Sequence, residues 1–394
     1  MRSRRIKALA SAVLCSVGCV VAAGSASGAA GHLDRSFGDG GLVTEFEFGY
    51  ADAVTTDARG RVVAVGRAEG AAVVMRYTTA GRRDRSFSRN GMVLTGAVGG
   101  RAVAMDSGRI LTAGSNSNSF NVARYRTNGR LDHSFSGDGT TTTDMGGNYE
   151  VVDSVAVDSK GRIVLGGYIH NRKRGGLLAV ARYLPNGRLD DSFGTHGKLT
   201  TSFPHSAGGA NGVALDSKDR IVAVGVGGTS DFAVARYRRS GKLDRSFGVN
   251  GSVTTGFGTY ANANSVVIDR KDQIVAAGPA GGDLALARYR PGGRLDRTFG
   301  TRGKVITDLG ERGAYLYAAA RGPRGRVVLA GRHDGRFALA RYRASGTLDR
   351  SFSDDGLVRK PGGGAYALAV DSEGRPVAAG FHANQFALVR YKGR

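Results

Sequence analysis

The chain has 394 residues, a formal net charge of +23 and a hydrophobic content of 41%. This length and hydrophobic content can form a large core, so the composition excludes a disordered or fibrous chain. Its two cysteines, Cys15 and Cys19, lie near the amino terminus, which excludes disulfides and cysteine-ligated metals from the rest of the chain.

Residues 1–30 have the pattern of a secretory signal peptide. Four basic residues precede an apolar run over Ala8–Ala23, and small residues offer a cleavage site before Gly31. The apolar run is too short to be a membrane-spanning helix. We therefore expect a secreted protein, by either the general or the twin-arginine route, whose mature part covers residues 31–394.

The mature chain is strongly basic. Without the four basic residues of the signal its net charge is still +19. A basic protein outside the cell favours anionic partners such as wall polymers, polysaccharides or released nucleic acid. Most of the basic residues recur at repeated positions, however, which indicates that many of them lie on solvated faces.

A twelve-residue motif, RYRASGTLDRSF in its last complete copy, recurs through the mature chain at intervals of 48 to 58 residues. Two half-copies flank the complete ones: Leu33–Phe37 lacks the Arg-Tyr, and Arg390-Tyr391 lacks the Leu-Asp. Repeats of this length are typical of propellers and solenoids. The complete copies are Arg76–Phe87, Arg124–Phe135, Arg182–Phe193, Arg236–Phe247, Arg288–Phe299 and Arg341–Phe352.

Each repeat contains four short β-strand patterns in the same order. Examples are Ser154–Asp158, Arg162–Gly166, Phe232–Tyr237 and the segment from Leu243 to Thr255. The runs are rich in Val, Ile, Ala and aromatic residues and are bounded by turn residues, and no helical period is sustained. Apolar residues occupy both faces of the second and third runs, as in strands packed between two neighbouring sheets.

The twelve-residue motif predicts a tight hairpin between the third and fourth strands. Arg and Asp stand eight residues apart with Gly five residues after Arg, which fits a three-residue loop ending in a left-handed glycine. This register places Arg opposite Asp, so we expect a structural ion pair in each repeat. The expected pairs are Arg76–Asp84, Arg124–Asp132, Arg182–Asp190, Arg236–Asp244, Arg288–Asp296, Arg341–Asp349 and, between the two half-copies, Arg390–Asp34.

Seven repeats of four antiparallel strands predict an all-β fold, a seven-bladed β-propeller that forms a single domain over residues 31–394. The split motif predicts how the ring closes. Leu33–Phe46 supplies the fourth strand of the last blade, whose first three strands come from Ala365–Tyr391. Pairing of the two ends would remove the exposed edges of an open array.

The repeat resembles the delta-60 repeat family of bacterial cell-surface proteins. The resemblance rests on ALARYRPGGRLDRTFG at Ala285–Gly300 and SVAVDSKGRIVLGG at Ser154–Gly167, and it extends over every repeat. It implies a secreted, propeller-like array. It implies no catalytic residue, because that family is defined by its repeat.

Two apparent active-site motifs are better explained by the repeat. Asp-x-Ser occurs in six of the seven repeats, whereas a hydrolase needs one activated serine. Acidic turns such as Ser136–Gly139 and Ser353–Gly356 resemble calcium loops, but only their last glycine recurs, so a tight turn is the simpler interpretation and calcium remains an alternative. We therefore expect no catalytic residue, no metal site and no cofactor.

Local function is expected where the repeats differ. The loops between blades and those between second and third strands share one face, and those of blades three and four are the longest. His333, His382 and Asn384 occupy matching loops of blades six and seven. The candidate ligand-binding residues are Tyr149, Glu150, His170, Arg172, Lys173, Arg174 and His205.

The sequence favours a binding or scaffold protein that recognises anionic polysaccharide or wall polymer through this basic loop face, or else another surface protein. The alternative is an extracellular hydrolase or lyase near the central channel, which would bring a carboxylate such as Glu150 to His170 or His205. We expect a monomer without a membrane span and without a specific nucleic-acid partner.

Overall fold

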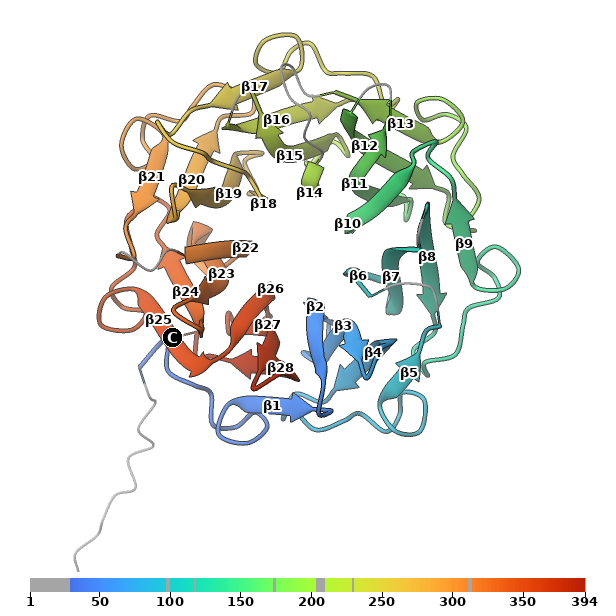
Figure 1. The fold of residues 1–394 in the computed structure, drawn as a ribbon, viewed down its shortest axis with the longest axis vertical. Coiled ribbons are helices and arrows are strands. Elements are labelled where there is room, and N and C mark those ends of the chain that lie inside the picture. The colour runs from blue at the N-terminus through green and yellow to red at the C-terminus, as the bar shows by residue number, and fades with distance from the viewer. Residues whose placement is uncertain are drawn as a thin grey trace, which may run out of the picture.

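The computed structural model describes residues 29–96, 100–116, 118–172, 175–202, 210–228, 230–310 and 314–393. Across these residues the chain forms seven four-stranded antiparallel sheets. The sheets stand as blades around a central opening (Figure 1). The only helical element in the described ranges of the chain is a short 3-10 turn, η1 (Pro323–Gly325). The predicted seven-bladed β-propeller is confirmed.

The strands follow one another from the central opening outward in each blade. Blade one comprises β2 (Gly49–Thr56), β3 (Val62–Ala68), β4 (Ala71–Tyr77) and β5 (Met92–Leu94). Blade two comprises β6 (Ala102–Asp106), β7 (Arg109–Asn116), β8 (Ser119–Tyr125) and β9 (Thr140–Thr143). Blade three comprises β10 (Tyr149–Val157), β11 (Ile163–Asn171), β12 (Gly175–Tyr183) and β13 (Lys198–Thr201).

The remaining blades repeat this order. Blade four comprises β14 (Ala210–Leu215), β15 (Ile221–Gly227), β16 (Asp231–Tyr237) and β17 (Ser252–Thr255). Blade five comprises β18 (Ser265–Ile268), β19 (Ile274–Ala280), β20 (Asp283–Tyr289) and β21 (Lys304–Thr307). Blade six comprises β22 (Ala314–Arg321), β23 (Val327–His333), β24 (Arg336–Tyr342) and β25 (Leu357–Gly362). Blade seven comprises β26 (Gly364–Val370), β27 (Pro376–His382), β28 (Gln385–Arg390) and β1 (Leu42–Glu45).

The hydrophobic core lies between adjacent blades. One cluster joins Val63 and Val74 of blade one to Ile110 and Ala123 of blade two, and all four side chains are buried. Both faces of the second and third strands are therefore covered, because each blade packs against a neighbour on either side. Full burial of a valine or isoleucine stabilises the fold by about 1.5–3 kcal/mol.

The two ends of the described chain close the ring in blade seven. Strand β1 pairs antiparallel with β28, so that Leu42 lies opposite Val389 and Glu45 opposite Phe386. Figure 1 shows the blue β1 beside the red β28. The predicted closure by the amino-terminal strand is confirmed.

The closing hairpin extends beyond these strands to Ala30. Gly31 N donates to Lys392 O, and Lys392 N donates to His32 O. The continuous turn of blade two has the same two bonds, from Gly129 N to Arg126 O and from Arg126 N to Arg130 O. Gly31 has a φ of 84°, a left-handed conformation that favours glycine. Ala30 is 5% exposed, and its carbonyl accepts a hydrogen bond from Ser353 N in blade six.

This geometry bears on the expected cleavage site. Cleavage after Ala30 would remove a buried residue of the closing turn, whereas cleavage after Ala29 would retain it. The rest of the expected signal peptide, residues 1–28 with Cys15 and Cys19, lies outside the described residues.

A buried arginine connects strands and blades in every repeat. Its Nε donates to Oδ2 of the motif aspartate at 2.8–3.0 Å in all seven pairs, Arg390–Asp34 included. Its Nη1 donates to a turn carbonyl of the next blade, and its guanidinium lies 4.4–4.8 Å from the centre of the motif phenylalanine ring. The arginine therefore joins the fourth strand to the third and one blade to the next.

The serine of the Asp-x-Ser motif completes this network. Ser86 Oγ donates to Asp84 Oδ1 at 2.7 Å and accepts from Arg76 Nη2 at 2.9 Å. Burial raises the pKa of Asp84, but hydrogen bonds from Ser86 and the charge of Arg76 outweigh it and hold the pKa below its usual value. The repeated Asp-x-Ser is a structural motif.

Replacing one such arginine should destabilise the whole ring. In Arg236→Ala, the buried Asp244 loses its bond to Arg236 but keeps an ion pair with Arg220 at 3.3 Å. A buried charge left without any partner costs about 3–5 kcal/mol, so we expect a loss of stability toward the lower end of that range. The matched control, Arg245→Ala, changes an exposed arginine of the same hairpin and should shift stability by less than about 0.5 kcal/mol. Chemical unfolding followed by circular dichroism measures both; equal midpoints would contradict the structural role.

Removing the closing strand should prevent folding. A chain that begins at Glu47 lacks β1 and Asp34, so β28 loses its outer neighbour and Arg390 its carboxylate. We expect aggregation or loss of cooperative unfolding in gel filtration and thermal melts. A chain that begins at Ala29 is the control and should fold, while one that begins at Gly31 should fold with a lower midpoint.

Candidate functional site

The sequence-predicted ligand residues are only partly brought together. Tyr149 on β10 and His170 on β11 are cross-strand neighbours, and Tyr149 is 52% exposed. The backbone N–H of Arg172 donates to Asn148 Oδ1 at 3.2 Å in the adjacent loop. Lys173, Arg174 and His205 lie outside the described residues.

Glu150 has a structural role that the sequence analysis did not predict. Its side chain is only 1% exposed, and its carboxylate accepts hydrogen bonds from Met145 N and Gly147 N at 2.9 Å. Burial raises the pKa of Glu150, although these backbone donors oppose the shift. Within the described chain no bond joins Glu150 to His170, so the acid–histidine pair required by the enzyme alternative is not formed by these two residues.

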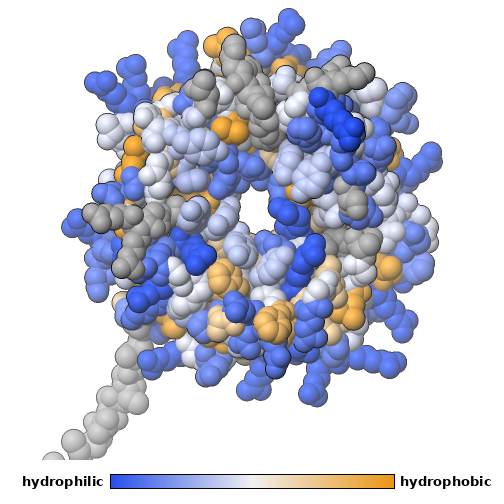
Figure 2. Space-filling model, viewed as in Figure 1, coloured by the Kyte–Doolittle hydropathy of each residue, from blue (hydrophilic) through white to orange (hydrophobic). Residues whose placement is uncertain are grey.

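The structure points instead to the mouth of the central channel. Figure 2 shows the channel open, bordered mainly by hydrophilic side chains, with hydrophobic ones gathered toward blades seven and one. The innermost strands border this opening, and five of them carry a β-bulge at the same position. A bulge leaves one residue unpaired and re-aims its side chain, which is why bulges often accompany functional sites.

The bulge position holds different residue types in different blades. In blades two and five the equivalent position is found from the strand register. Arg101 occupies it in blade two, directly before Ala102, which pairs with Ala113. Asn264 occupies it in blade five, directly before Ser265, which pairs with Ala277. The seven residues, which we call the mouth ring, are Asp52, Arg101, Asp153, Asn211, Asn264, Tyr317 and Tyr366.

Blades one to five give the mouth ring a polar side. Arg101 Nη2 donates to Asp153 Oδ1 at 3.0 Å, and Asn211 Nδ2 donates to Asn262 Oδ1 at 2.8 Å. Asn264 Nδ2 donates to the carbonyl of Leu316 at 2.6 Å. Amide, carboxylate and guanidinium groups are thus held in fixed positions around the channel.

Asp52 is a mouth-ring residue with a partly buried carboxylate. Burial raises its pKa to about 7, although the charges of Arg101 and Arg67 oppose the shift. No described residue forms a hydrogen bond to its carboxylate. Asp52 is therefore an acceptor, or when protonated a donor, that remains available to a ligand.

Blades six, seven and one give the mouth ring an aromatic side. Tyr366 meets Tyr317 edge-on at 5.3 Å between ring centres and Tyr50 at 6.0 Å, and it also packs against Phe381. Tyr315, stacked on Tyr317, is 63% exposed. These rings leave aromatic surface in contact with solvent.

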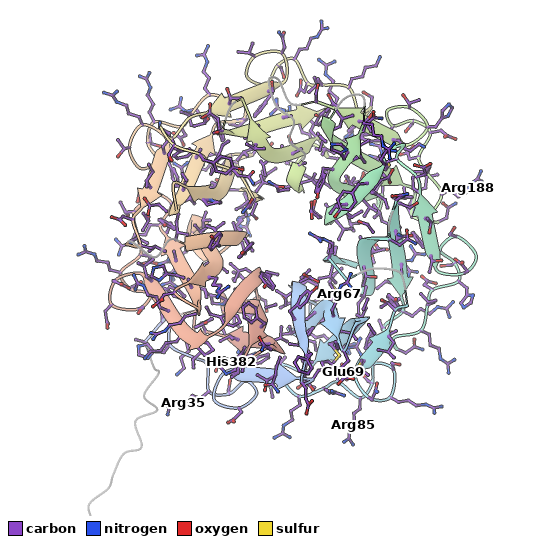
Figure 3. All side chains as sticks on the ribbon, in the orientation of Figure 1. Arg35, Arg67, Glu69, Arg85, Arg188 and His382 are labelled. Carbon is purple, nitrogen blue, oxygen red and sulfur yellow. The ribbon has the colours of Figure 1, made fainter. Side chains whose placement is uncertain are left out.

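A cavity of about 520 Å³ adjoins the aromatic side, within the range typical of small-molecule sites. Figure 3 shows Arg67 near the central opening, with Glu69 farther out on blade one and His382 on blade seven. The sequence-noted Asn384 also borders this cavity. Its lining comprises Phe48, Gly49, Tyr50, Arg67, Glu69, Gly70, Tyr366, Phe381 and Asn384.

The described residues include no group of three or more His, Cys, Asp or Glu side chains placed to hold a metal ion. The carboxylate of Asp138, in one of the acidic turns, accepts hydrogen bonds from Thr140 N and Thr140 Oγ1. In the other, Asp355 accepts from Leu357 N and Arg359 Nη1. No helix of the described chain is long and apolar enough to cross a membrane.

Sequence reasoning missed the mouth ring, although a signal was present. Each ring residue directly precedes the first-strand pattern, as Asp153 precedes SVAVD at Ser154–Asp158. Aligned on that pattern, the column reads Asp, Arg, Asp, Asn, Asn, Tyr, Tyr. A non-repeating column beside a repeating strand could have marked these residues.

Comparisons with known proteins agree with the fold. The sequence matches the family described as a domain of unknown function (DUF5122) beta-propeller at residues 106–135, 161–193, 219–247 and 325–352. No curated protein matches the chain by sequence. The chain is a repeat protein of the β-propeller class.

Solved structures show the same architecture at low identity. Virginiamycin B lyase from Staphylococcus aureus aligns with a TM-score of 0.56 and 10% identity over 88% of this chain and 98% of its own. The WD40 domain of Toxoplasma gondii coronin gives 0.52 and 13% over 90% and 87%. The WD40 propeller of Doa1 gives 0.51 and 11% over 89% and 98%. These likenesses are evidence of fold alone.

Asp52→Asn should alter the dependence of stability on pH. A carboxyl whose pKa rises from 3.8 unfolded to about 7 folded contributes stability that is fully present below pH 3.8 and is lost as the pH rises through about 7. We expect the variant to be more stable at pH 8 by about 1–2 kcal/mol, after allowance for its partial exposure. Unfolding measured from pH 4 to pH 8 tests this. Asp191→Asn, at a side chain that is 83% exposed, is the control; parallel curves for Asp52→Asn and the unsubstituted chain would refute the assignment.

Proposed function

We propose that this protein is a secreted carbohydrate-binding β-propeller whose ligand site is the mouth ring and the adjoining aromatic cavity. The observation that carries the proposal is the mouth ring itself. One position in the repeat, on or directly beside the innermost strand, holds four different residue types in the seven blades and supplies polar groups on one side and tyrosines on the other.

The two sides match the two kinds of surface on a sugar. Tyr50, Tyr317 and Tyr366 offer partly exposed aromatic surface against which the apolar face of a pyranose can pack. Asp52, Arg101, Asp153 and Asn211 offer donors and acceptors for hydroxyl groups. Concave sites with a few fixed polar groups beside apolar walls are typical of small-ligand binding.

Two arginines beside the aromatic side support an acidic sugar in particular, although the site also contains the acidic residues Asp52, Asp153 and Glu69. Arg67 lines the aromatic cavity, and Arg332 lies over the Phe381 ring at 5.7 Å. Guanidinium groups bind carboxylates through paired hydrogen bonds. A uronic-acid polysaccharide or anionic wall polymer therefore fits better than a neutral glucan, in agreement with the net charge of +19 expected for the mature chain.

The proposed setting is the cell surface. The secretory pattern of residues 1–30 and the resemblance to delta-60 repeat proteins support it. Propellers also act as enzymes, and the hydrolase or lyase alternative needs a carboxylate such as Glu150 beside His170 or His205. Glu150 forms no bond with His170, and His205 lies outside the described residues.

Alanine variants of the aromatic side should weaken sugar binding. We expect Tyr366→Ala and Tyr317→Ala each to reduce affinity for a uronic-acid hexasaccharide at least tenfold, because each removes a face on which the ring packs. Calorimetric titration measures this, with Tyr260→Ala, an exposed tyrosine outside the cavity, as the control.

Two comparisons sharpen this experiment. Binding of the acidic sugar should weaken as salt is raised, since exposed charges are screened, whereas a neutral glucose hexasaccharide should show little dependence. Unchanged affinity in both tyrosine variants, or binding of neither sugar at millimolar concentration, would disprove the proposed function.

A further inference from the structure

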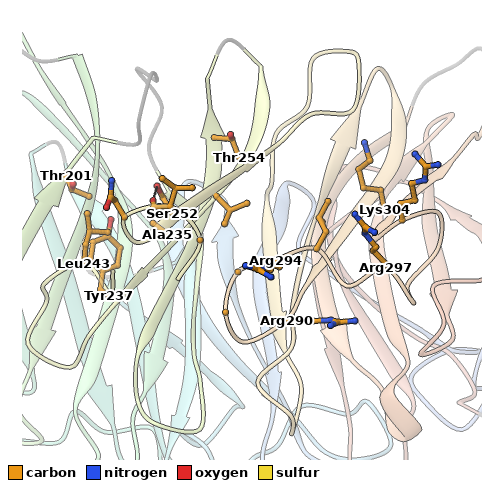
Figure 4. A pocket seen from close by; sticks show the side chains of 18 of the residues that line it. Thr201, Ala235, Tyr237, Leu243, Ser252, Thr254, Arg290, Arg294, Arg297 and Lys304 are labelled. Carbon is orange, nitrogen blue, oxygen red and sulfur yellow. Dashed lines mark hydrogen bonds between the residues drawn. The ribbon is translucent and has the colours of Figure 1, made fainter. Parts of the chain in front are cut away.

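A second concave surface lies on the outside of the ring, between blades four and five. It is a groove of about 1470 Å³, bordered by β17, by the turn around Asn250 and by the blade-five hairpin. It exceeds the size typical of a small-molecule pocket, which favours a polymeric occupant. Figure 4 shows Arg290, Arg294, Arg297 and Lys304 on the blade-five side, across from Thr201, Leu243 and Ser252.

The blade-five wall of this groove is positively charged. No acidic residue among the described ones lines it. The five cations that line it are Arg290, Arg294, Arg297, Arg302 and Lys304. Arg294, Arg297 and Arg302 form no ion pair with any described residue. Lys304 Nζ donates only to the carbonyl of Gly256, at 2.9 Å. Arg290 pairs with Asp296 at 3.6 Å. Four of the five cations in this wall therefore have no counter-ion among the described residues.

The floor of the groove is apolar and aliphatic. Leu243, Val249, Val253 and Leu295 line it, and Val249 is 76% exposed. The one aromatic side chain in the lining, Tyr237, is buried. Sugars and unpaired nucleic-acid bases pack on exposed aromatic rings, so an aliphatic floor favours a different occupant.

The neighbouring groove provides an internal comparison. Between blades five and six the equivalent positions of Arg294, Arg302 and Lys304 hold Thr347, Asp355 and Leu357. That groove also contains Asp308 and Asp354.

Four of the five cations have a basic equivalent in at least one other blade, as Arg343 and Arg350 show for Arg290 and Arg297. Arg302 is the exception, because its position holds Asn, Asp or His in the other complete copies of the motif. The repeat therefore does not explain Arg302, and the blade-five groove is distinguished by combining it with the other four cations.

Strand β17 adds a constraint on the shape of the occupant. It is the outermost strand of its sheet, paired only with β16, and Ser252, Val253 and Thr254 line the groove. An edge strand presents unpaired backbone groups to an added strand. In an extended peptide alternate side chains point to opposite sides, so acidic residues could meet the cations while aliphatic residues meet the floor.

We propose that the groove between blades four and five binds an extended segment of a partner protein in which acidic and aliphatic residues alternate. Charge complementarity with the five cations selects the acidic residues, and Leu243, Val249, Val253 and Leu295 receive the aliphatic ones. The site is separate from the mouth ring and does not depend on carbohydrate binding.

The test uses a labelled ten-residue peptide of alternating Glu and Val, measured by fluorescence anisotropy on the full-length chain. We expect Arg294→Thr combined with Arg302→Thr to weaken binding at least tenfold. The matched control, Arg130→Thr combined with Arg188→Thr, removes the same charge at exposed arginines of blades two and three and should leave binding unchanged. A peptide with the five Glu and five Val in two blocks should bind at least tenfold more weakly than the alternating one.

The reverse exchange tests sufficiency. Thr347→Arg combined with Asp355→Arg should give blade six a second site and raise the peptide stoichiometry toward two. Equal peptide binding by the blade-five variant and the unsubstituted protein, in a chain whose unfolding midpoint is unchanged, would overturn the proposal. It would also be overturned if that variant lost binding to heparin or to single-stranded DNA but kept binding to the peptide.

Discussion

The structure depends on a buried arginine that occurs once in every blade. Its guanidinium binds the motif aspartate, the motif serine (a threonine in blade five) and a carbonyl of the following blade, and it lies over the motif phenylalanine. A buried charge is costly unless it is paired and fully hydrogen-bonded, so each arginine tolerates only the arrangement that satisfies it. Seven such arginines link seven blades in a ring, and the last link, from Arg390 to Thr79 O, joins the carboxyl-terminal strand to blade one.

Ring closure follows from the same network. Described residues contain no cysteine, so the two ends are held by β-pairing, by the Arg390–Asp34 ion pair and by packing of hydrophobic residues such as Phe37 and Tyr391. In the other six blades one continuous segment forms the turn of this hairpin. In blade seven two separate segments, which contain Gly31 and Lys392, form the same turn. The closing blade therefore uses the same hydrogen bonds and ion pair as the other six, although Arg390 and Asp34 are 356 positions apart in the sequence.

Because the repeated residues have structural roles, recognition is left to positions where the blades differ. The mouth ring is one such set, on the innermost strands, and Arg302, in the groove between blades four and five, is another such position, on the outermost hairpin. The same physical reason applies to both surfaces. A side chain that points away from the blade-to-blade contacts can change without loss of core packing. The two surfaces face the channel and the outside of the ring, so both could be occupied at once.

The sequence by itself determined the blade count, the strand order, the Arg–Asp pairs and the closing strand, because these depend on short-range spacing that repeats seven times. It directed attention to the long loops of blade three, but it could not show that Glu150 turns inward to bind Met145 N and Gly147 N. Only the tertiary structure decided that Asp52, Arg101 and Tyr366 meet at one channel mouth, since residues more than 200 positions apart become neighbours only when the ring closes. It likewise decided which cations share a groove, because that surface is formed by two blades and belongs to neither repeat alone.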